Sequence, residues 1–363
     1  MENNNISIAF AFDYNFYRQA VVAISSLVSL NSKVGYDIYC IVKSDITPAL
    51  QKEIKTIIEG KSVLSKVFFI DTGSYFENAY ECRGITKAAY YRLMLHRLLD
   101  IDKIIYSDVD VLFEDDLTQI YNTEMDSFLI GMPIDPNLNF QNIRKNLEKT
   151  YKYWRVDLKN IGKNYHCSGF LIINLKKMRE ANLDDEIFSL AKREFLFQDM
   201  DILNILFSNR QSQVLRVSSR YCFIAKFDYN HLCDDGIISK EELHETLNNP
   251  AIIHYAGIKP WNNKSVHMAD KWWDYMKQNT PYYSYFKKQY HKLLIKKIIE
   301  ILKKKFLSMQ IKEKNGKKYK ILYILGIKIK LSQPSFLKSD IPIYKIAKYH
   351  VDQLIKNINL RRK

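Results

Sequence analysis

The sequence predicts an α/β fold with a mainly parallel sheet, and two observations carry this prediction. Apolar runs rich in β-branched and aromatic residues alternate with segments of helical periodicity through the first third of the chain, which is typical of successive β-α units. Polar clusters follow directly after two of these runs, at Asp13 and at residues 108–110. Because ligands bind at the carboxyl ends of strands in open α/β sheets, both clusters are expected to line one crevice.

The elements follow in order along the chain. Strands are expected where short apolar runs are bounded by turn residues; these are residues 6–12, 36–42, 67–71, 104–106, 166–175 and 251–254. Helices are expected where apolar side chains recur every three to four residues; these are residues 17–30, 46–58, 86–99, 184–193 and a helix start within 197–206. Pro48 falls in the first turn of the second helix, where proline is favoured.

The composition bounds the class of protein. The 363 residues are 47% hydrophobic and 26% charged, which indicates a folded chain with a large core. The five cysteines show no CxxC spacing, which argues against a zinc site built from them and favours a reduced, cytoplasmic protein. We find neither a secretory signal nor an apolar stretch long enough to span a bilayer.

The net charge of +15 is concentrated at the end of the chain. Residues 287–363 hold 22 basic and 4 acidic residues, while the rest of the chain holds 33 and 36. We therefore predict a catalytic domain at 1–280 and a basic, aromatic region at 281–363. A helix at 290–306 and a hairpin at 317–331 around Gly326 suit binding to an anionic membrane surface; a solvated basic surface is the alternative.

The segment Asp108-Val109-Asp110 is the first candidate for chemistry. In extended chain, residues two apart share a face, so both carboxylates can reach one point. Such oxygen ligands suit Mg²⁺ or Mn²⁺, and His254, at the end of a later strand, favours Mn²⁺. A solvated turn or a helix cap is the alternative for the carboxylates, and a structural histidine for His254.

Six segments in order resemble the retaining glycosyltransferases of family 8, which include bacterial lipopolysaccharide and lipooligosaccharide galactosyl- and glucosyltransferases. Within residues 6–273 they are IAFAFDYNF, ITKAAYYRLMLHRLL, DKIIYSDVDVLFEDDLTQIY, CSGFLIINL, FQDMDILN and IIHYAGIKPW. The resemblance implies a GT-A fold, in which a Rossmann-like nucleotide-binding sheet with helices on both faces holds a UDP-sugar and Mn²⁺.

The resemblance also implies roles for individual residues. The implied metal ligands are Asp108, Asp110 and His254. Ala11, Asp13 and Asn15 are the implied contacts with uridine and ribose. Val109 is a further implied donor contact. Arg92, Gly257 and Lys259 are the implied contacts with the diphosphate. The implied catalytic residues are Asp199, Arg92 and Asp135.

Asp199 is the residue that we expect beside the anomeric centre, which becomes oxocarbenium-like and needs a nearby negative or polar group. The alternative is that Asp199 or Asp201 caps the helix that follows. Two positions depart from the family pattern. Met200 stands where many bacterial members have a glutamine, and Cys167 stands where an asparagine is usual. Methionine cannot act as a nucleophile, so the sequence favours attack on the face from which the diphosphate leaves.

The sequence thus predicts a Mn²⁺- or Mg²⁺-dependent retaining hexosyltransferase at the inner face of the cell membrane. It would move galactose or glucose from a UDP-hexose to a bacterial surface glycan or glycolipid such as lipooligosaccharide. Within the same fold, a protein or teichoic acid acceptor is an alternative, as is a catalytically inactive relative. Nucleic-acid binding is disfavoured, because the positive charge is confined to residues 287–363 and the sequence contains no zinc finger or RNP motif.

Overall fold

The structure is a computed structural model that describes residues 5–82, 86–137, 165–314, 317–324 and 327–331. The chain divides into two compact units, residues 1–287 and residues 288–363. Gly326, in the turn of the predicted hairpin, lies outside the described residues.

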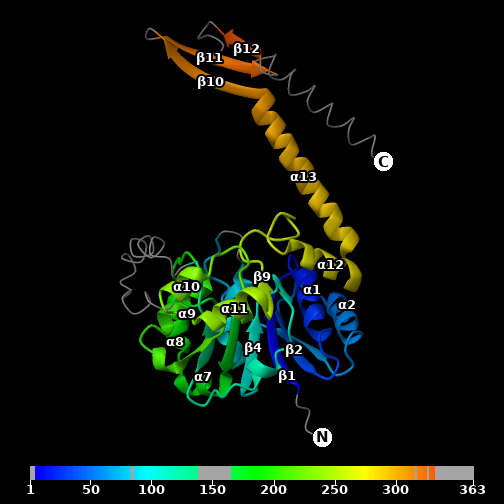
Figure 1. Cartoon of the computed structure of the whole chain (residues 1–363), viewed down its shortest axis with the longest axis vertical. Coiled ribbons are helices and arrows are strands. Elements are labelled where there is room, and N and C mark those ends of the chain that lie inside the picture. The colour runs from blue at the N-terminus through cyan, green and yellow to red at the C-terminus, as the bar shows by residue number, and fades with distance from the viewer. Residues whose placement is uncertain (1–4, 83–85, 138–164, 315–316, 325–326, 332–363) are drawn as a thin grey trace. The chain divides into compact units, whose positions relative to one another are not determined.

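A seven-stranded sheet forms the centre of the first unit, with helices packed around it (Figure 1). Its order is β3-β2-β1-β4-β7-β6-β8. The strands are β1 (Ile6–Ala11), β2 (Tyr36–Val42), β3 (Lys66–Asp71), β4 (Lys103–Ser107), β6 (Ile130–Pro133), β7 (Phe170–Asn174) and β8 (Val214–Val217). The run β3-β2-β1-β4 is parallel throughout, which confirms the predicted class. β7 is antiparallel to both of its neighbours.

The first two helices form much as the sequence predicts. α1 (Tyr17–Val28) buries Val21, Ile24 and Leu27 completely, which accounts for its apolar periodicity. α2 (Pro48–Glu59) begins with Pro48, and the Thr47 side chain accepts a hydrogen bond from the Leu50 amide. Figure 1 shows both helices beside β1 and β2.

Residues 86–99 differ from the predicted α-helix. They form a 3-10 helix, η1 (Lys87–Met94), followed by the short α3 (Leu95–Leu98). Five successive residues from Tyr90 to Met94 are buried, so this segment has no solvent face. An amphipathic α-helix buries only one stripe of side chains, whereas this segment is enclosed on all sides and places the Arg92 guanidinium inside the protein.

A separate two-stranded antiparallel ladder joins β5 (Val111–Phe113) to β9 (Ile252–His254). This pairing connects the segment after β4 to a segment far along the chain. Among the described residues, the further helices of the unit are α4 (Thr118–Tyr121), α7 (Leu175–Ala181), α8 (Asp184–Ala191), α9 (Gln198–Leu206), η3 (Gln211–Gln213), η4 (Ser219–Cys222), α10 (Asn230–Asp234), α11 (Lys240–Asn248) and α12 (Ala269–Asn279).

The second unit contains an antiparallel sheet of β10 (Leu307–Lys314), β11 (Lys317–Ile324) and β12 (Ile327–Leu331), in that order. β11 and β12 confirm the predicted hairpin, and β10 is an additional strand. The predicted basic helix is the later part of α13 (Tyr283–Phe306), in which Leu294 and Ile298 are exposed. In the described parts of the chain, every helix is too short or too polar to cross a bilayer.

Candidate active site

A cavity of about 400 Å³ opens where β1 and β4 end and where β9 approaches them. This volume lies within the range of small-molecule sites. Most of the residues that the sequence singled out line it: Ala11, Asp13, Arg92, Asp108, Val109, Asp110, Asp135, Asp199, His254, Gly257 and Lys259. Asn15 is exposed and is not among the lining residues; its amide donates to Asp13 Oδ1 at 2.9 Å.

Backbone pairing brings the two carboxylates and His254 together. The Asp108 amide donates to the Gly169 carbonyl at 2.9 Å, directly beyond the β4–β7 ladder. In the β5–β9 ladder Val111 faces His254, and the Tyr255 amide donates to the Asp110 carbonyl at 2.9 Å. The positions of these three side chains are therefore fixed by strand register.

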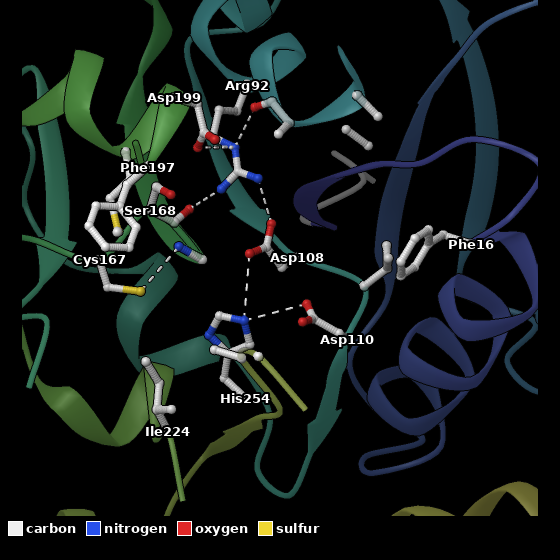
Figure 2. A pocket seen from close by; sticks show the side chains of 18 of the residues that line it. Phe16, Arg92, Asp108, Asp110, Cys167, Ser168, Phe197, Asp199, Ile224 and His254 are labelled. Atoms are coloured by element: carbon white, nitrogen blue, oxygen red, sulfur yellow. Dashed lines mark hydrogen bonds and ion pairs between the residues drawn. The ribbon is translucent and has the colours of Figure 1, made fainter. Parts of the chain in front are cut away.

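The resulting donor set fits a divalent cation. His254 Nε2 lies 3.6 Å from Asp108 Oδ2 and 3.4 Å from Asp110 Oδ1 (Figure 2). Neighbouring ligands of an octahedral ion at about 2.1 Å stand about 3 Å apart, so small side-chain adjustments would complete this geometry. Two carboxylates and one imidazole are a set that suits Mn²⁺, with Mg²⁺ as the harder alternative.

Basic side chains balance these carboxylates within the chain. Lys259 Nζ contacts Asp110 Oδ2 and donates to the Tyr255 carbonyl at 3.1 Å. Burial disfavours the ionised form of Asp110, but Lys259 and His254 outweigh it and hold the pKa of that carboxyl well below its usual range. Burial also disfavours the charged imidazole, yet Asp110 raises the pKa of His254 to about 10. The site is thus built to concentrate charge of both signs.

Arg92 links the Asp108 carboxylate to the Asp199 carboxylate. Its Nη2 lies 2.6 Å from Asp108 Oδ1, its Nε lies 3.2 Å from Asp199 Oδ2, and its Nη1 contacts the Ser168 carbonyl. Figure 2 shows the guanidinium between the carboxylates of Asp108 and Asp199. Because Arg92 is almost fully buried, this geometry fixes where its positive charge sits.

The carboxylates of Asp199 and Asp201, at the start of α9, have different surroundings in the structure. Asp201 Oδ2 accepts a hydrogen bond of 2.7 Å from the Phe197 amide, and Asp201 Oδ1 contacts the Tyr165 hydroxyl. Asp201 therefore stabilises the helix start, and Asp199 is left to line the cavity. Burial raises the pKa of Asp199, Arg92 lowers it and Asp108 raises it further, giving a value of about 6.

Gly169 is a residue whose importance the sequence did not reveal. A Cβ at this position would lie 2.5 Å from His254 Cε1, 2.8 Å from His254 Nδ1 and 3.1 Å from Asp108 Oδ2. The imidazole thus packs on bare backbone, and any side chain here displaces a predicted metal ligand. The only sequence signal was its place before an apolar strand, which is equally explained by strand entry.

We expect Gly169→Ala to lower kcat/KM by at least about tenfold, because displacements near 1 Å in an active site cost up to about a hundredfold. Steady-state assays of donor turnover measure this. The matched control is Gly73→Ala, where an added Cβ meets open space although φ is +57°. That control should cost some stability and leave kcat/KM unchanged. Equal losses in both variants would contradict the assigned role of Gly169.

Gly257 and Lys226 form another close contact that the sequence did not predict. Gly257 adopts φ +86°, and a Cβ there would lie 2.5 Å from Lys226 Nζ. Both residues line the cavity, near Lys259. Since Lys226 lies in an irregular segment with no recognisable motif, only the fold could place it beside the glycine.

A mainly parallel sheet with a charged cavity at its strand ends is the architecture of an α/β enzyme. The chain belongs to glycosyl transferase family 8, whose sequence profile matches residues 7–265. It is therefore a glycosyltransferase.

Relatives support this membership across most of the chain. General stress protein A of Bacillus subtilis is 25% identical over 264 residues, covering 70% of this chain and 86% of the relative. Lipopolysaccharide 1,2-glucosyltransferase of Escherichia coli is 22% identical over 312 residues, covering 80% and 86%. The crystal structure of the galactosyltransferase LgtC with donor and acceptor sugar analogs aligns with a TM-score of 0.62 at 25% identity, covering 76% of this chain and 96% of LgtC. This likeness confirms the predicted GT-A type of fold.

Proposed function

We propose that this protein is a Mn²⁺-dependent retaining hexosyltransferase that transfers galactose or glucose from a UDP-sugar to a bacterial surface glycan. The observation that carries the proposal is the convergence of Asp108, Asp110 and His254 in one cavity with Arg92 and Lys259. The relatives named as a lipopolysaccharide glucosyltransferase and as a galactosyltransferase support this choice of sugar and acceptor.

Asp108, Asp110 and His254 Nε2 would hold the metal ion, which would supply positive charge at the leaving diphosphate. Lys259 and Arg92 add fixed positive charge at the same place. Charges that are already oriented need no reorganisation when the diphosphate develops its extra negative charge, so they stabilise the transition state more than water would. Lys259 would exchange its contact with Asp110 for one with the diphosphate.

The opposite wall of the cavity would face the sugar. Asp199, Asp135 and Met200 all line the cavity. Since the Met200 thioether cannot form a covalent glycosyl intermediate, the acceptor hydroxyl would attack on the face from which the diphosphate departs. The ionised Asp199 carboxylate would stabilise positive charge at the anomeric centre.

This role of Asp199 predicts an acid limb in the pH dependence of the reaction. With a pKa of about 6, the carboxyl is ionised at neutral pH and becomes protonated as the pH falls below that value. We expect kcat/KM to fall by about tenfold per pH unit below about pH 6. Initial rates between about pH 5 and pH 8 measure this, with circular dichroism confirming that the protein stays folded. A rate that is constant down to about pH 5 would contradict the role.

The activity itself is tested by UDP release from a panel of UDP-sugars, with Mn²⁺ and with EDTA. The proposal predicts release that is selective for one hexose and abolished by EDTA. If no UDP-sugar is turned over with or without glycan acceptors, and the folded protein still binds UDP, the chain is an inactive relative. If the protein does not bind UDP, the choice of donor is wrong.

For residues 281–363 we propose peripheral binding to the inner face of the cell membrane, where a glycolipid acceptor would lie. The exposed Leu294 and Ile298, set among lysines on α13, support this proposal. Basic residues near an anionic surface contribute about 1 kcal/mol each. The full chain should sediment with anionic vesicles at low salt and be released at high salt. Equal sedimentation with neutral vesicles, or none with anionic ones, would refute the proposal.

A further inference from the structure

Two cysteines lie directly behind the imidazole of His254, on the side away from Asp108 and Asp110. Cys222 Sγ is 3.3 Å from His254 Nδ1 and 3.4 Å from Cys167 Sγ. All three side chains are buried, and their three donor atoms lie within 4.8 Å of one another. Cys167 precedes β7, Cys222 ends η4 and His254 ends β9, so three distant segments build this cluster.

We propose that Cys167, Cys222 and His254 Nδ1 form a second metal site, selective for thiophilic ions of the Zn²⁺ class. Zinc–sulfur bonds of about 2.3 Å and zinc–nitrogen bonds of about 2.0 Å place tetrahedral ligands roughly 3.5 to 3.8 Å apart. The observed separations of 3.4 Å and 3.3 Å are within a few tenths of an ångström of these values. The cluster is therefore nearly preformed for such an ion.

The chemistry of the donors separates this site from the carboxylate site. Thiolates select Zn²⁺ and similar soft ions, whereas the carboxylates select Mn²⁺ or Mg²⁺. Binding forms two metal–sulfur bonds and one metal–nitrogen bond, and the two thiol protons and the proton on His254 Nδ1 leave to solvent. Cys167 lines the active-site cavity, which gives an ion a route to the otherwise buried cluster. Three protein ligands leave a fourth position for water or a second donor.

The two sites share one imidazole, which makes them interdependent. An ion on Nδ1 withdraws electron density from the ring and places positive charge next to Nε2, where the carboxylate site begins. We therefore expect occupation of the thiolate site to weaken Mn²⁺ binding by at least about fivefold, and Mn²⁺ to weaken zinc binding by the same factor. A Zn²⁺-class ion would thus act as an inhibitor from outside the carboxylate site.

The test is a titration of the full-length protein with Co²⁺, a spectroscopic substitute for Zn²⁺, under a non-thiol reductant. The wild type should develop a sulfur-to-cobalt charge-transfer band that saturates with one Co²⁺ at the thiolate site, and Zn²⁺ should abolish the band. Cys222→Ser should lose this band and weaken binding by at least about tenfold. Cys167→Ala should do the same, which keeps the test decisive if one variant does not fold.

Two controls isolate the cluster. Cys233→Ser changes a cysteine outside the cluster and should leave the titration unchanged. Asp110→Asn removes a donor of the carboxylate site and should leave the charge-transfer band intact, so the outcome does not depend on the proposed transferase activity. A wild type without the band, or a band that survives both Cys222→Ser and Cys167→Ala, would overturn the proposal.

Discussion

Replacing Asp108 with asparagine is expected to lower kcat/KM for the UDP-sugar by at least about a hundredfold. The change removes one negative charge while keeping the volume of the side chain. Asp108 both offers Oδ2 to the proposed metal site and pairs with Arg92 through Oδ1 at 2.6 Å. Loss of one group that stabilises developing charge costs about 10²- to 10³-fold in other enzymes, and this variant disturbs two such groups.

The measurement is Mn²⁺-dependent UDP release at several Mn²⁺ concentrations. Because the variant loses a ligand, part of the deficit should appear as a higher Mn²⁺ requirement. Asp100→Asn is the matched control, since Asp100 is exposed and lies before β4, away from the cavity lining. An Asp108→Asn enzyme with near wild-type activity at low Mn²⁺ would show that the metal lies elsewhere.

Much of the parallel half of the fold could be predicted because each of its strands and helices has a recognisable pattern in its own stretch of sequence. The strands at β1, β2, β3 and β4 are apolar runs with sharp polar ends, and α1 and α2 show regular periodicity. The antiparallel insertion of β7 could not be predicted, since a Gly-entered apolar run carries no signal for direction. The 3-10 form of η1 was equally hidden, because burial on all sides depends on the surrounding sheet and helices.

For the site, sequence reasoning found side chains whose position follows from a strand end. Asp108 and Asp110 could be placed at a strand end because the apolar run before them is recognisable as a strand. His254 was placed at a strand end, but its pairing with β5 was not foreseen, and that pairing brings His254 to the two carboxylates. The choice between Asp199 and Asp201 depended on the Phe197 amide, four residues before Asp201, and on the Tyr165 hydroxyl, which only the folded chain brings near.

The contact between Cys167 and Cys222 is a further feature that the sequence did not predict. Their spacing in the sequence argued against a zinc site, because zinc motifs are recognised by short, regular intervals. The fold places Cys167 and Cys222 in contact although they belong to separate elements. Spacing rules detect sites built by one loop, and they miss sites assembled by tertiary structure.

Replacing Arg92 with methionine is expected to destabilise the protein by about 3–5 kcal/mol and to abolish activity. Removing one partner of a buried ion pair leaves the other charge without compensation, and Arg92 faces both Asp108 and Asp199. Urea unfolding at neutral pH without added metal measures the loss. Arg97→Met is the matched control, since Arg97 pairs with Asp184 at 2.6 Å but its side chain is 34% exposed. An ion pair of this kind contributes about 0–1 kcal/mol.

The double variant Arg92→Met/Asp199→Asn separates charge from packing. If an uncompensated Asp199 carboxylate causes much of the loss, neutralising it should restore part of the stability, while activity stays absent. Asp199→Asn alone should cost little stability, because it removes a buried carboxylate whose ionisation burial disfavours. If the double variant is as unstable as the two single losses combined, the contribution of Arg92 is packing. The guanidinium would then not be the charge that organises this cavity.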